Sequence, residues 1–419
     1  MLVIEKDKKT KTAVVCPIDK NSSDIFADDI SHKLEEARGL VEAMGQAVVF
    51  VCPVKMQKFN SGLFFGKGTV EKLKLQCEEC GAELLAVDGK LTPIQQRNLE
   101  KALNLKVIDR TAVILEIFGR RAKTKEGRLQ VELAHLSYQR GRLVRSWTHL
   151  ERQRGGGGFL GGPGETQIEL DKRHLDERIL KIKKELEKVK KTRFIQRAAR
   201  VKVPYPTVAL VGYTNAGKST LFNYITKENV FAKDMLFATL DPTMRKVTLN
   251  DGCEVIFSDT VGFIADLPHE LVMAFRATLE EVLEAEIILH VIDVSNPQYK
   301  KQRQDVIEVL HELGLDKIES KPNYFEVFNK MDLLEPTNPD VPVFKKNDIK
   351  VSALSGEGVD KLIDVLSGYF IKKNKIEDVV IDISDGQALA EIYRTAEVLE
   401  RTDDEEHIHL KVKYLHKKH

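Results

Sequence analysis

The first 110 residues alternate between two patterns of apolar positions. Short continuous apolar runs, typical of buried strands, occur at 12–18, 47–52, 84–88 and 105–108. Between these runs, apolar positions recur every three to four residues, as in helices, over 29–44, 69–79 and 92–103. Because strands that alternate with helices usually form parallel sheets, the pattern predicts a small parallel α/β layer.

The pattern changes after residue 120 into two long helical stripes. In the first stripe, apolar residues recur at steps of four and three, with Arg140 in the one vacant place: Leu129, Leu133, Leu136, Leu143, Trp147 and Leu150. The second stripe consists of Leu175, Ile179, Ile182, Leu186 and Val189. Both are seams of the coiled-coil type, and the glycine-rich stretch 152–164 separates them. They predict an antiparallel helical hairpin with a flexible tip.

Strands and helices alternate again after Pro204 and Pro206. Apolar runs predict strands at 208–211, 254–258, 287–292, 323–328 and 349–351. Helical periodicity follows residue 217 and returns over 271–283, while His290 is expected to be a hydrogen-bonded core histidine. The last segment predicts a β-α-β module, with a helix at 388–399 between strands at 378–383 and 407–412.

A phosphate-binding loop connects the run 208–211 to the next helix. Residues 212–219 read Gly-Tyr-Thr-Asn-Ala-Gly-Lys-Ser, which is the phosphate-loop spacing in its strand–loop–helix context, although a chance glycine-rich turn is the alternative. Lys218 would bring its charge to the β- and γ-phosphates, and the Ser219 hydroxyl would bind Mg²⁺. The expected nucleotide-binding residues here are Gly212, Tyr213, Thr214, Asn215, Ala216, Gly217, Lys218, Ser219 and Thr220.

A second motif, Asn-Lys-Met-Asp at 329–332, selects the base. The Asp332 carboxylate can accept hydrogen bonds from two adjacent donors of guanine. Adenine lacks this donor pair, so bound adenine would leave buried polar groups unpaired. Asn329 can brace the loop and reach the base, and the Lys330 stem can lie over the purine. Backbone N–H groups of Ser352 and Ala353 would reach the guanine carbonyl. Alone, this tetrad would be an ordinary turn, but downstream of a phosphate loop it predicts GTP.

Two segments between these motifs resemble GTPase switches. Asp259 and Gly262 follow the strand 254–258; Asp259 would hold Mg²⁺ through water, and the Gly262 N–H would meet the γ-phosphate. In the stretch 237–243, Phe237 would line the nucleotide and Thr239 would bind Mg²⁺ when the γ-phosphate is present, with Thr243 as the alternative. The catalytic prediction is Lys218, Thr239 and Gly262, and the metal prediction is Ser219, Thr239 and Asp259.

Phe263 occupies the position where Ras-like enzymes carry a glutamine that orients the attacking water. A phenyl ring cannot hydrogen-bond to this water, so intrinsic hydrolysis should be slow, about 10⁻⁴ to 10⁻³ s⁻¹, until another element completes the site. The Asn215 amide could hold K⁺ beside the phosphates. Equally, asparagine is simply favoured in tight loops.

Composition limits the rest of the interpretation. A chain of 419 residues with 42% hydrophobic and 31% charged residues is globular and is expected to form several domains. We expect an N-terminal α/β domain over 1–120, a hairpin over 121–203, a P-loop GTPase domain over 204–373 and a small α/β domain over 374–419. Five scattered cysteines, no signal-like start and no membrane-spanning run favour the cytoplasm, with peripheral membrane association left open.

The net charge of only +1 requires any nucleic-acid contact to come from a local patch. Arginines gather near the hairpin tip: Arg140, Arg142, Arg145, Arg152 and Arg154. With Phe159 and exposed backbone N–H groups, the tip could follow an RNA backbone. A plain linker whose arginines cover helix surface is an equal alternative.

The chain resembles the HflX family, in the Obg–HflX branch of translation-factor-class GTPases. Segments that carry this resemblance lie at 95–100, 107–111, 129–134, 161–167, 212–219, 237–243 and 259–263. The resemblance implies binding to the large ribosomal subunit and its rRNA, and GTP-controlled splitting of stalled or idle ribosomes. We expect no DNA partner and a monomer when the protein is free. A ribosome-assembly or RNA-modification GTPase is the alternative. The basic hairpin argues against a third possibility, a signalling switch with protein partners alone.

Overall fold

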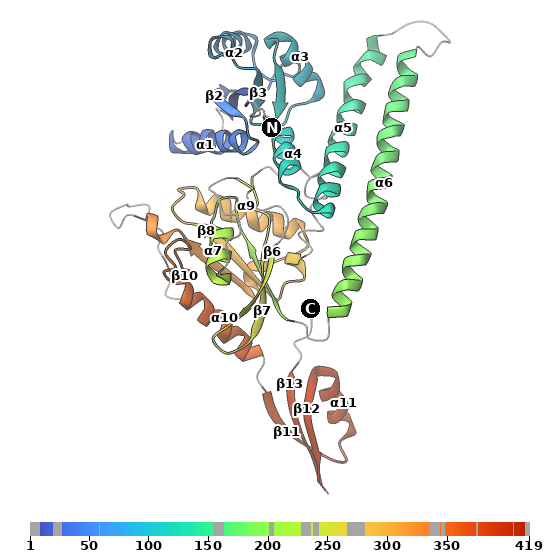
Figure 1. The fold of residues 1–419 in the computed structure, drawn as a ribbon, viewed down its shortest axis with the longest axis vertical. Helices are drawn as coiled ribbons and strands as arrows, with labels where there is room; N and C mark the ends of the chain where they lie inside the picture. Colours follow the sequence, from blue (N-terminus) through green and yellow to red (C-terminus); the bar gives the residue numbers. More distant parts are fainter. Residues whose placement is uncertain are drawn as a thin grey trace, which may run out of the picture.

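The computed structural model describes residues 9–19, 27–57, 59–153, 163–200, 205–227, 236–237, 243–265, 281–334, 344, 348–373, 376–404 and 406–414. Figure 1 shows an N-terminal domain, a central domain and a small C-terminal sheet domain along the longest axis, with a long helical hairpin beside the first two. This arrangement confirms the predicted α/β fold class with a helical hairpin.

The N-terminal domain is built on a parallel sheet with strand order β2-β1-β3-β4. Its strands are β1 Lys11–Asp19, β2 Ala47–Met56, β3 Leu84–Val87 and β4 Lys106–Asp109. Its helices are α1 Ala27–Ala43, α2 Lys67–Cys80, α3 Pro93–Leu103 and α4 Arg110–Arg121. Each strand predicted here is present, and β2 continues four residues beyond the predicted end at 52.

Successive residues of β1 point into two separate cores, as the two-residue period of a strand requires. Ala13 and Val15 pack with α2 and α3. Val14 and Cys16 pack with α1 and α4, in a core that continues into the central domain through Phe237 and Phe263. The face of the sheet that α1 and α4 cover therefore joins the two domains.

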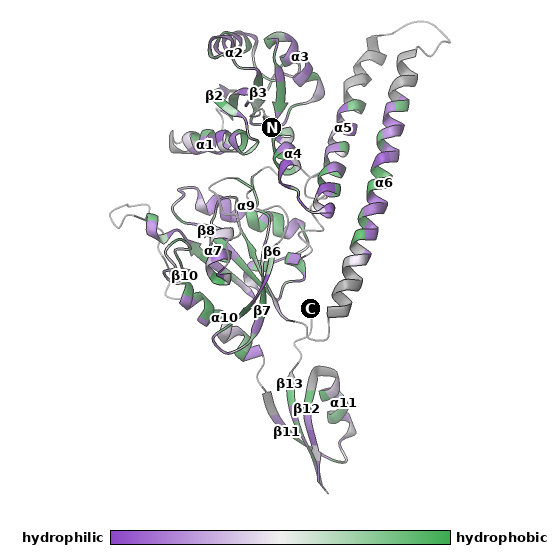
Figure 2. Ribbon diagram, in the orientation of Figure 1, coloured by the Kyte–Doolittle hydropathy of each residue, from purple (hydrophilic) through white to green (hydrophobic). Residues whose placement is uncertain are grey.

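The hairpin consists of α5 Lys125–Gln153 and α6 Pro163–Arg200. Among the described residues, ion pairs cross the hairpin from Arg140 to Asp176 at 2.5 Å and from Arg178 to Glu132 at 2.6 Å, so the arginine that interrupts the first apolar stripe has a partner. Hydrophilic residues dominate the described part of α6 (Figure 2). Residues 154–162 of the predicted tip, and the side chains of Trp147 and Leu150, lie outside the described residues.

The central domain has a six-stranded sheet of order β10-β9-β8-β5-β7-β6, in which only β6 is antiparallel. Its strands are β5 Thr207–Val211, β6 Thr243–Thr248, β7 Glu254–Asp259, β8 Ile287–Asp293, β9 Tyr324–Asn329 and β10 Ile349–Lys350. Its described helices are α7 Lys218–Thr226, α9 Tyr299–Glu312, α10 Val359–Lys373 and the short η1 Ile318–Ser320 and η2 Met331–Leu333. Most of the helix predicted at 271–283 lies outside the described residues.

The C-terminal domain corrects one prediction. It contains β11 Ile376–Asp382, α11 Gly386–Thr395, β12 Ala396–Asp403 and β13 His407–Tyr414, with antiparallel strand order β11-β13-β12. The helix predicted over 388–399 ends at Thr395, and a third strand follows at once. Val398 pairs with Val412 of β13 and joins the same small core, so cross-strand packing overrides the helical periodicity. Among the described helices, none is long and apolar enough to cross a membrane.

Candidate functional site

The phosphate loop lies between β5 and α7, at the carboxyl edge of the central sheet. A side-chain Cβ at Gly212 would lie 2.3 Å from the Val291 carbonyl oxygen, and one at Gly217 would lie 2.2 Å from Nδ2 of Asn329. Gly217 also has φ of 90°, which favours glycine. The two glycines of the motif therefore allow the loop to pass close to β8 and to the base-recognition segment.

Lys218 is buried at the start of α7. Its Nζ donates to the carbonyl oxygens of Gly212 at 3.0 Å and Tyr213 at 2.8 Å, which holds the ammonium group over the loop. Burial lowers the pKa of Lys218 to about 8, although the Asp259 carboxylate acts in the opposite direction. A phosphate beside this cation would compensate for its lost hydration.

The predicted metal ligands Ser219 and Asp259 come from different elements and meet. The Ser219 hydroxyl donates to Oδ2 of Asp259 at 2.7 Å, and Asp259 is fully buried at the end of β7. Hydroxyl and carboxylate oxygens are hard ligands that suit Mg²⁺. Thr239 lies outside the described residues, whereas Thr243 pairs directly with Asp259 across the sheet.

Asn329 brings three predicted segments together. Its Nδ2 donates to the Ala216 carbonyl at 2.8 Å, and its Oδ1 accepts from the Ala353 N–H at 2.9 Å. The phosphate loop is thus fixed to both base-recognition segments, and the bracing role uses both ends of the amide. Ser352 is fully buried beside Ala353, and its N–H donates to the Glu357 carbonyl at 2.9 Å.

Lys330 and Asp332 lie at the turn after β9. Lys330 adopts a positive φ of 65°, and its Nζ lies 2.7 Å from Oδ2 of Asp293 at the end of β8. Asp332 is exposed in η2. Sequence reasoning missed Asp293, although an acidic residue at the end of a predicted apolar strand was a signal for it.

The first switch residue, Phe237, is almost completely buried with φ of 55°. Its ring meets the ring of Phe118 in α4 edge to face, with centroids 4.6 Å apart. This contact was not foreseen, because nothing in the sequence near Phe237 indicates a partner in another domain.

The second switch segment is paired to the phosphate loop. The Phe263 N–H donates to the Gly212 carbonyl at 3.1 Å, and the Thr214 N–H donates to the Phe263 carbonyl at 2.7 Å. A Cβ at Gly262 would lie 3.1 Å from the Lys218 ammonium. The Phe263 side chain is buried in the core shared with the N-terminal domain. The structure therefore brings Gly262 close to Lys218 and turns Phe263 away from solvent.

Tyr213 has a further role that its place in the motif does not suggest. Its hydroxyl donates to Oε2 of Glu36 in α1 at 2.8 Å and accepts from the Ala265 N–H at 2.9 Å. Burial, followed by the Glu36 charge, raises the pKa of Tyr213, so the hydroxyl keeps its proton.

A strand–loop–helix phosphate site, a buried serine–aspartate pair and an asparagine-braced base loop, all at one edge of a largely parallel sheet, define a P-loop GTPase. Four family models match the chain: "GTP-binding GTPase N-terminal" at 31–119, "GTP-binding GTPase Middle Region" at 121–200, "50S ribosome-binding GTPase" at 207–330 and "HflX C-terminal domain" at 343–418. The chain belongs to the HflX family of GTPases, which confirms the resemblance, and it binds and hydrolyses GTP.

Two relatives named GTPase HflX support this assignment over most of the chain. The protein named GTPase HflX from Magnetococcus marinus is 49% identical over 383 residues, which cover 91% of this chain and 88% of that protein. GTPase HflX from Escherichia coli is 45% identical over 337 residues, which cover 80% of this chain and 78% of that protein. A solved structure described as the SsGBP and GDP complex has 24% identity and a TM-score of 0.47, covering 87% of this chain and 99% of that one.

Proposed function

We propose that this GTPase binds the large ribosomal subunit and its rRNA, in the cytoplasm, and splits stalled or idle ribosomes under the control of GTP. The observation that carries this proposal is the match of 207–330 to a family described as 50S ribosome-binding GTPase. The hairpin adds support, because a straight helix of the 38 residues of α6 is about 57 Å long and can reach far from the nucleotide.

The proposed division of labour follows the four predicted units. Residues 1–120 and 121–203 form the N-terminal domain and the hairpin that contact the ribosome. Residues 204–373 bind GTP, with Mg²⁺ held by Ser219, Asp259 and Thr239, or by Thr243 in its place. Residues 374–419 form the C-terminal domain. The free protein acts as a monomer.

The ion pairs of two hairpin arginines reduce the number of arginines proposed to contact RNA. Arg140 is paired with Asp176, and Arg142 is paired with Asp109 of the N-terminal domain. These two arginines support the architecture, so phosphate contact is proposed for Arg152 and Arg154, whose side chains lie outside the described residues. K⁺ at Asn215 is a separate proposal. The positive φ of 62° at Asn215 also fits the alternative, a loop asparagine chosen for its conformation.

A sucrose gradient with purified 70S ribosomes tests the proposed function. The protein is loaded with a non-hydrolysable GTP analogue, and a GDP-loaded sample is the matched control. Dissociation of 70S particles with the analogue but not with GDP supports splitting. Binding only to immature precursor subunits would favour the assembly alternative. Absence of the protein from all ribosomal fractions would reject both.

A further inference from the structure

Helix α4 touches both switch segments of the GTPase domain from the N-terminal domain. At its first residue, Nη2 of Arg110 donates to the Ala265 carbonyl at 3.1 Å. Two turns later, the Phe118 ring packs on Phe237. Helix α4 thus contacts Ala265, two residues beyond the second switch motif 259–263, and Phe237, the first residue of the first switch motif.

The peptide groups of Ala265 are held from two domains. Its N–H donates to the Tyr213 hydroxyl of the phosphate loop at 2.9 Å, while its carbonyl accepts from Arg110. Glu36 joins these two donors, because Oε1 accepts from Arg110 at 2.6 Å and Oε2 accepts from Tyr213 at 2.8 Å. We call Glu36, Arg110, Tyr213 and Ala265 the switch clamp.

Arg110 and Tyr213 of the switch clamp are buried and Glu36 is partly buried, which makes their charged network costly to rearrange. Arg110 Nη1 also meets Oδ1 of Asp88 at 2.5 Å, so one guanidinium group serves two carboxylates. Burial alone would lower the pKa of Arg110, but Asp88 and Glu36 outweigh it and raise this pKa, so the cation persists. Breaking such a pair leaves a buried charge without compensation.

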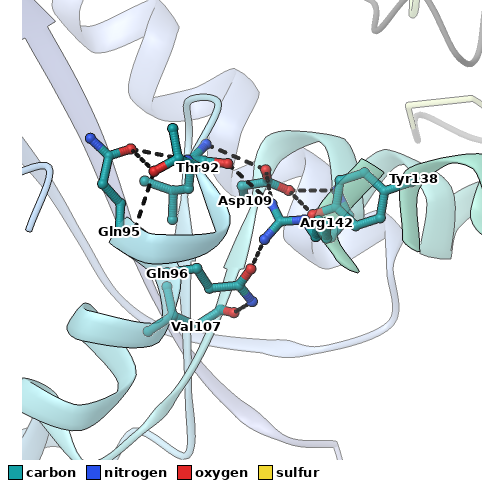
Figure 3. Close-up of polar contacts among 9 residues, drawn as sticks. Thr92, Gln95, Gln96, Val107, Asp109, Tyr138 and Arg142 are labelled. Atoms are coloured by element: carbon teal, nitrogen blue, oxygen red, sulfur yellow. Dashed lines mark hydrogen bonds and ion pairs between the residues drawn. The ribbon is translucent and has the colours of Figure 1, made fainter. Parts of the chain in front are cut away.

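The residue before Arg110 anchors the hairpin. Asp109 caps α4 by accepting from the Ala112 N–H at 2.9 Å, and it also accepts from the Tyr138 hydroxyl at 2.7 Å and from Arg142 at 2.6 Å. Figure 3 shows Arg142 and Tyr138 of α5 converging on this carboxylate, while Gln96 holds the other side of Arg142. We call Asp109, Tyr138 and Arg142 the hairpin anchor.

The hairpin anchor and the switch clamp meet at consecutive residues, the cap and the first residue of α4. A displacement of α5 that moves Asp109 must also move Arg110, since both lie in the same hydrogen-bonded turn. Packed networks of this kind tend to adopt discrete arrangements instead of deforming continuously. The motif at 107–111 therefore has a structural explanation as the junction between hairpin and GTPase.

We propose that α4 couples the hairpin to the two switches, with Arg110 and Tyr213 as positioning residues for the second switch through Ala265. Asp259, Gly262 and Phe263 lie within six residues of Ala265, so its position affects the residues expected at Mg²⁺ and at the γ-phosphate. The coupling is a property of the free protein. The further idea that this coupling transmits ribosome contact from the hairpin to the nucleotide site rests on the proposed function.

Hydrogen–deuterium exchange of the peptide 259–265 in the full-length, GDP-loaded protein tests this coupling without ribosomes. Tyr213→Phe removes one hydroxyl of the switch clamp, and Arg142→Lys weakens the hairpin anchor. Tyr369→Phe is the control for the first, because the Tyr369 hydroxyl donates to Glu286 at 3.0 Å elsewhere in the GTPase domain. Arg178→Lys is the control for the second, because it weakens a 2.6 Å ion pair inside the hairpin.

We expect Tyr213→Phe and Arg142→Lys each to speed exchange in 259–265 by about three- to tenfold, as the loss of one net hydrogen bond implies, while both controls leave it unchanged. Unchanged exchange in Tyr213→Phe would reject the clamp, and unchanged exchange in Arg142→Lys would reject the link to the hairpin. If Arg142→Lys does not fold, Tyr138→Phe tests the same link. Failure to bind ribosomes would reject the proposed function and leave these exchange results unaffected.

Discussion

At the scale of single residues, the Asn329 side chain connects the phosphate loop to both base-recognition segments. Sequence reasoning predicted that it braces the base loop, and its contacts with Ala216 and Ala353 are of that kind. The sequence does not show why residue 217 must be a glycine. A Cβ there would lie 2.2 Å from Nδ2 of Asn329, a residue more than a hundred positions further along the chain. Motif spacing thus predicts which residues form the nucleotide site, but not the contacts that require each residue type.

The assignment of Asp332 to the guanine base predicts a change of nucleotide preference. Asp332→Asn should weaken GTP binding by about 2–4 kcal/mol, since a charge-assisted bond is lost and a partner is left unpaired. It should improve binding of xanthosine triphosphate, whose extra carbonyl can accept from the new amide. Calorimetry measures both affinities, and Asp316→Asn, at another exposed aspartate of the domain, is the control. Equal GTP affinity in Asp332→Asn and wild type would reject the assignment.

The lowered pKa of Lys218 predicts that nucleotide binding takes up protons at alkaline pH. Burial lowers this pKa to about 8 from an ordinary 10.5, and a bound phosphate would raise it again. Between these values the free protein holds a neutral lysine and the complex a charged one, so GDP affinity should fall as pH rises through this window.

Calorimetry in two buffers of different ionisation enthalpy measures this proton uptake. At pH of about 9, we expect uptake approaching one proton for each GDP bound. At pH of about 7, where Lys218 is protonated in both states, its contribution should disappear, which provides the internal control. Equal proton uptake at both pH values would show that Lys218 does not titrate on binding.

At the scale of elements, buried strands were the most predictable part. The inner parallel strands β5, β7 and β8 are apolar on both faces because helices cover both sides, so each was visible as a continuous run. The antiparallel edge strand β6 was missed, because its sequence is largely polar and none of its residues is buried. The second face of α5 was not visible, because the leucine seam masked it. Val131, Ala134 and Tyr138 pack into the N-terminal core, and Arg142 on that side resembled a phosphate contact until its partner Asp109 was located.

The anchoring of α5 at Asp109 predicts that breaking this ion pair lowers the free energy of unfolding far more than breaking the exposed pair within the hairpin. Asp109→Ala removes the α4 cap and leaves the largely buried Arg142 without its carboxylate, so the free energy of unfolding should fall by about 3–5 kcal/mol. Asp176→Ala breaks the half-exposed pair with Arg140 and should cost less than about 1 kcal/mol. Denaturant unfolding followed by circular dichroism compares them, and equal losses would contradict the anchor.

At the scale of the whole molecule, the N-terminal and GTPase domains share one apolar core. Cys16 and Ile114 from the first domain lie in the same cluster as Phe237 and Phe263 from the second. No local pattern predicts such a contact, because the apolar faces of α1 and α4 suit any covering layer. The sequence therefore predicts local strands, helices and motifs, while the interface between the N-terminal and GTPase domains is seen only in the structure.

A projecting hairpin tip that binds rRNA should affect ribosome binding and not nucleotide binding. Changing both Arg152 and Arg154 to alanine should weaken pelleting with ribosomes and make its salt dependence shallower, because fewer phosphate counterions are released. GTP affinity measured in parallel should be unchanged. The control changes Lys300 and Lys301 of α9 to alanine. Undiminished pelleting at every salt concentration would favour a plain linker, and a loss of GTP affinity would assign the tip to the nucleotide site.

The rate of GTP hydrolysis with and without purified large ribosomal subunits shows whether the ribosome completes the nucleotide site of this protein. Phe263 cannot orient the attacking water, so the isolated protein should turn over GTP at about 10⁻⁴ to 10⁻³ s⁻¹. If the ribosome is the partner that completes the site, saturating large subunits should raise this rate about a hundredfold or more, whereas small subunits should not. The same slow rate with and without large subunits would contradict the proposal that the large subunit completes the hydrolysis site.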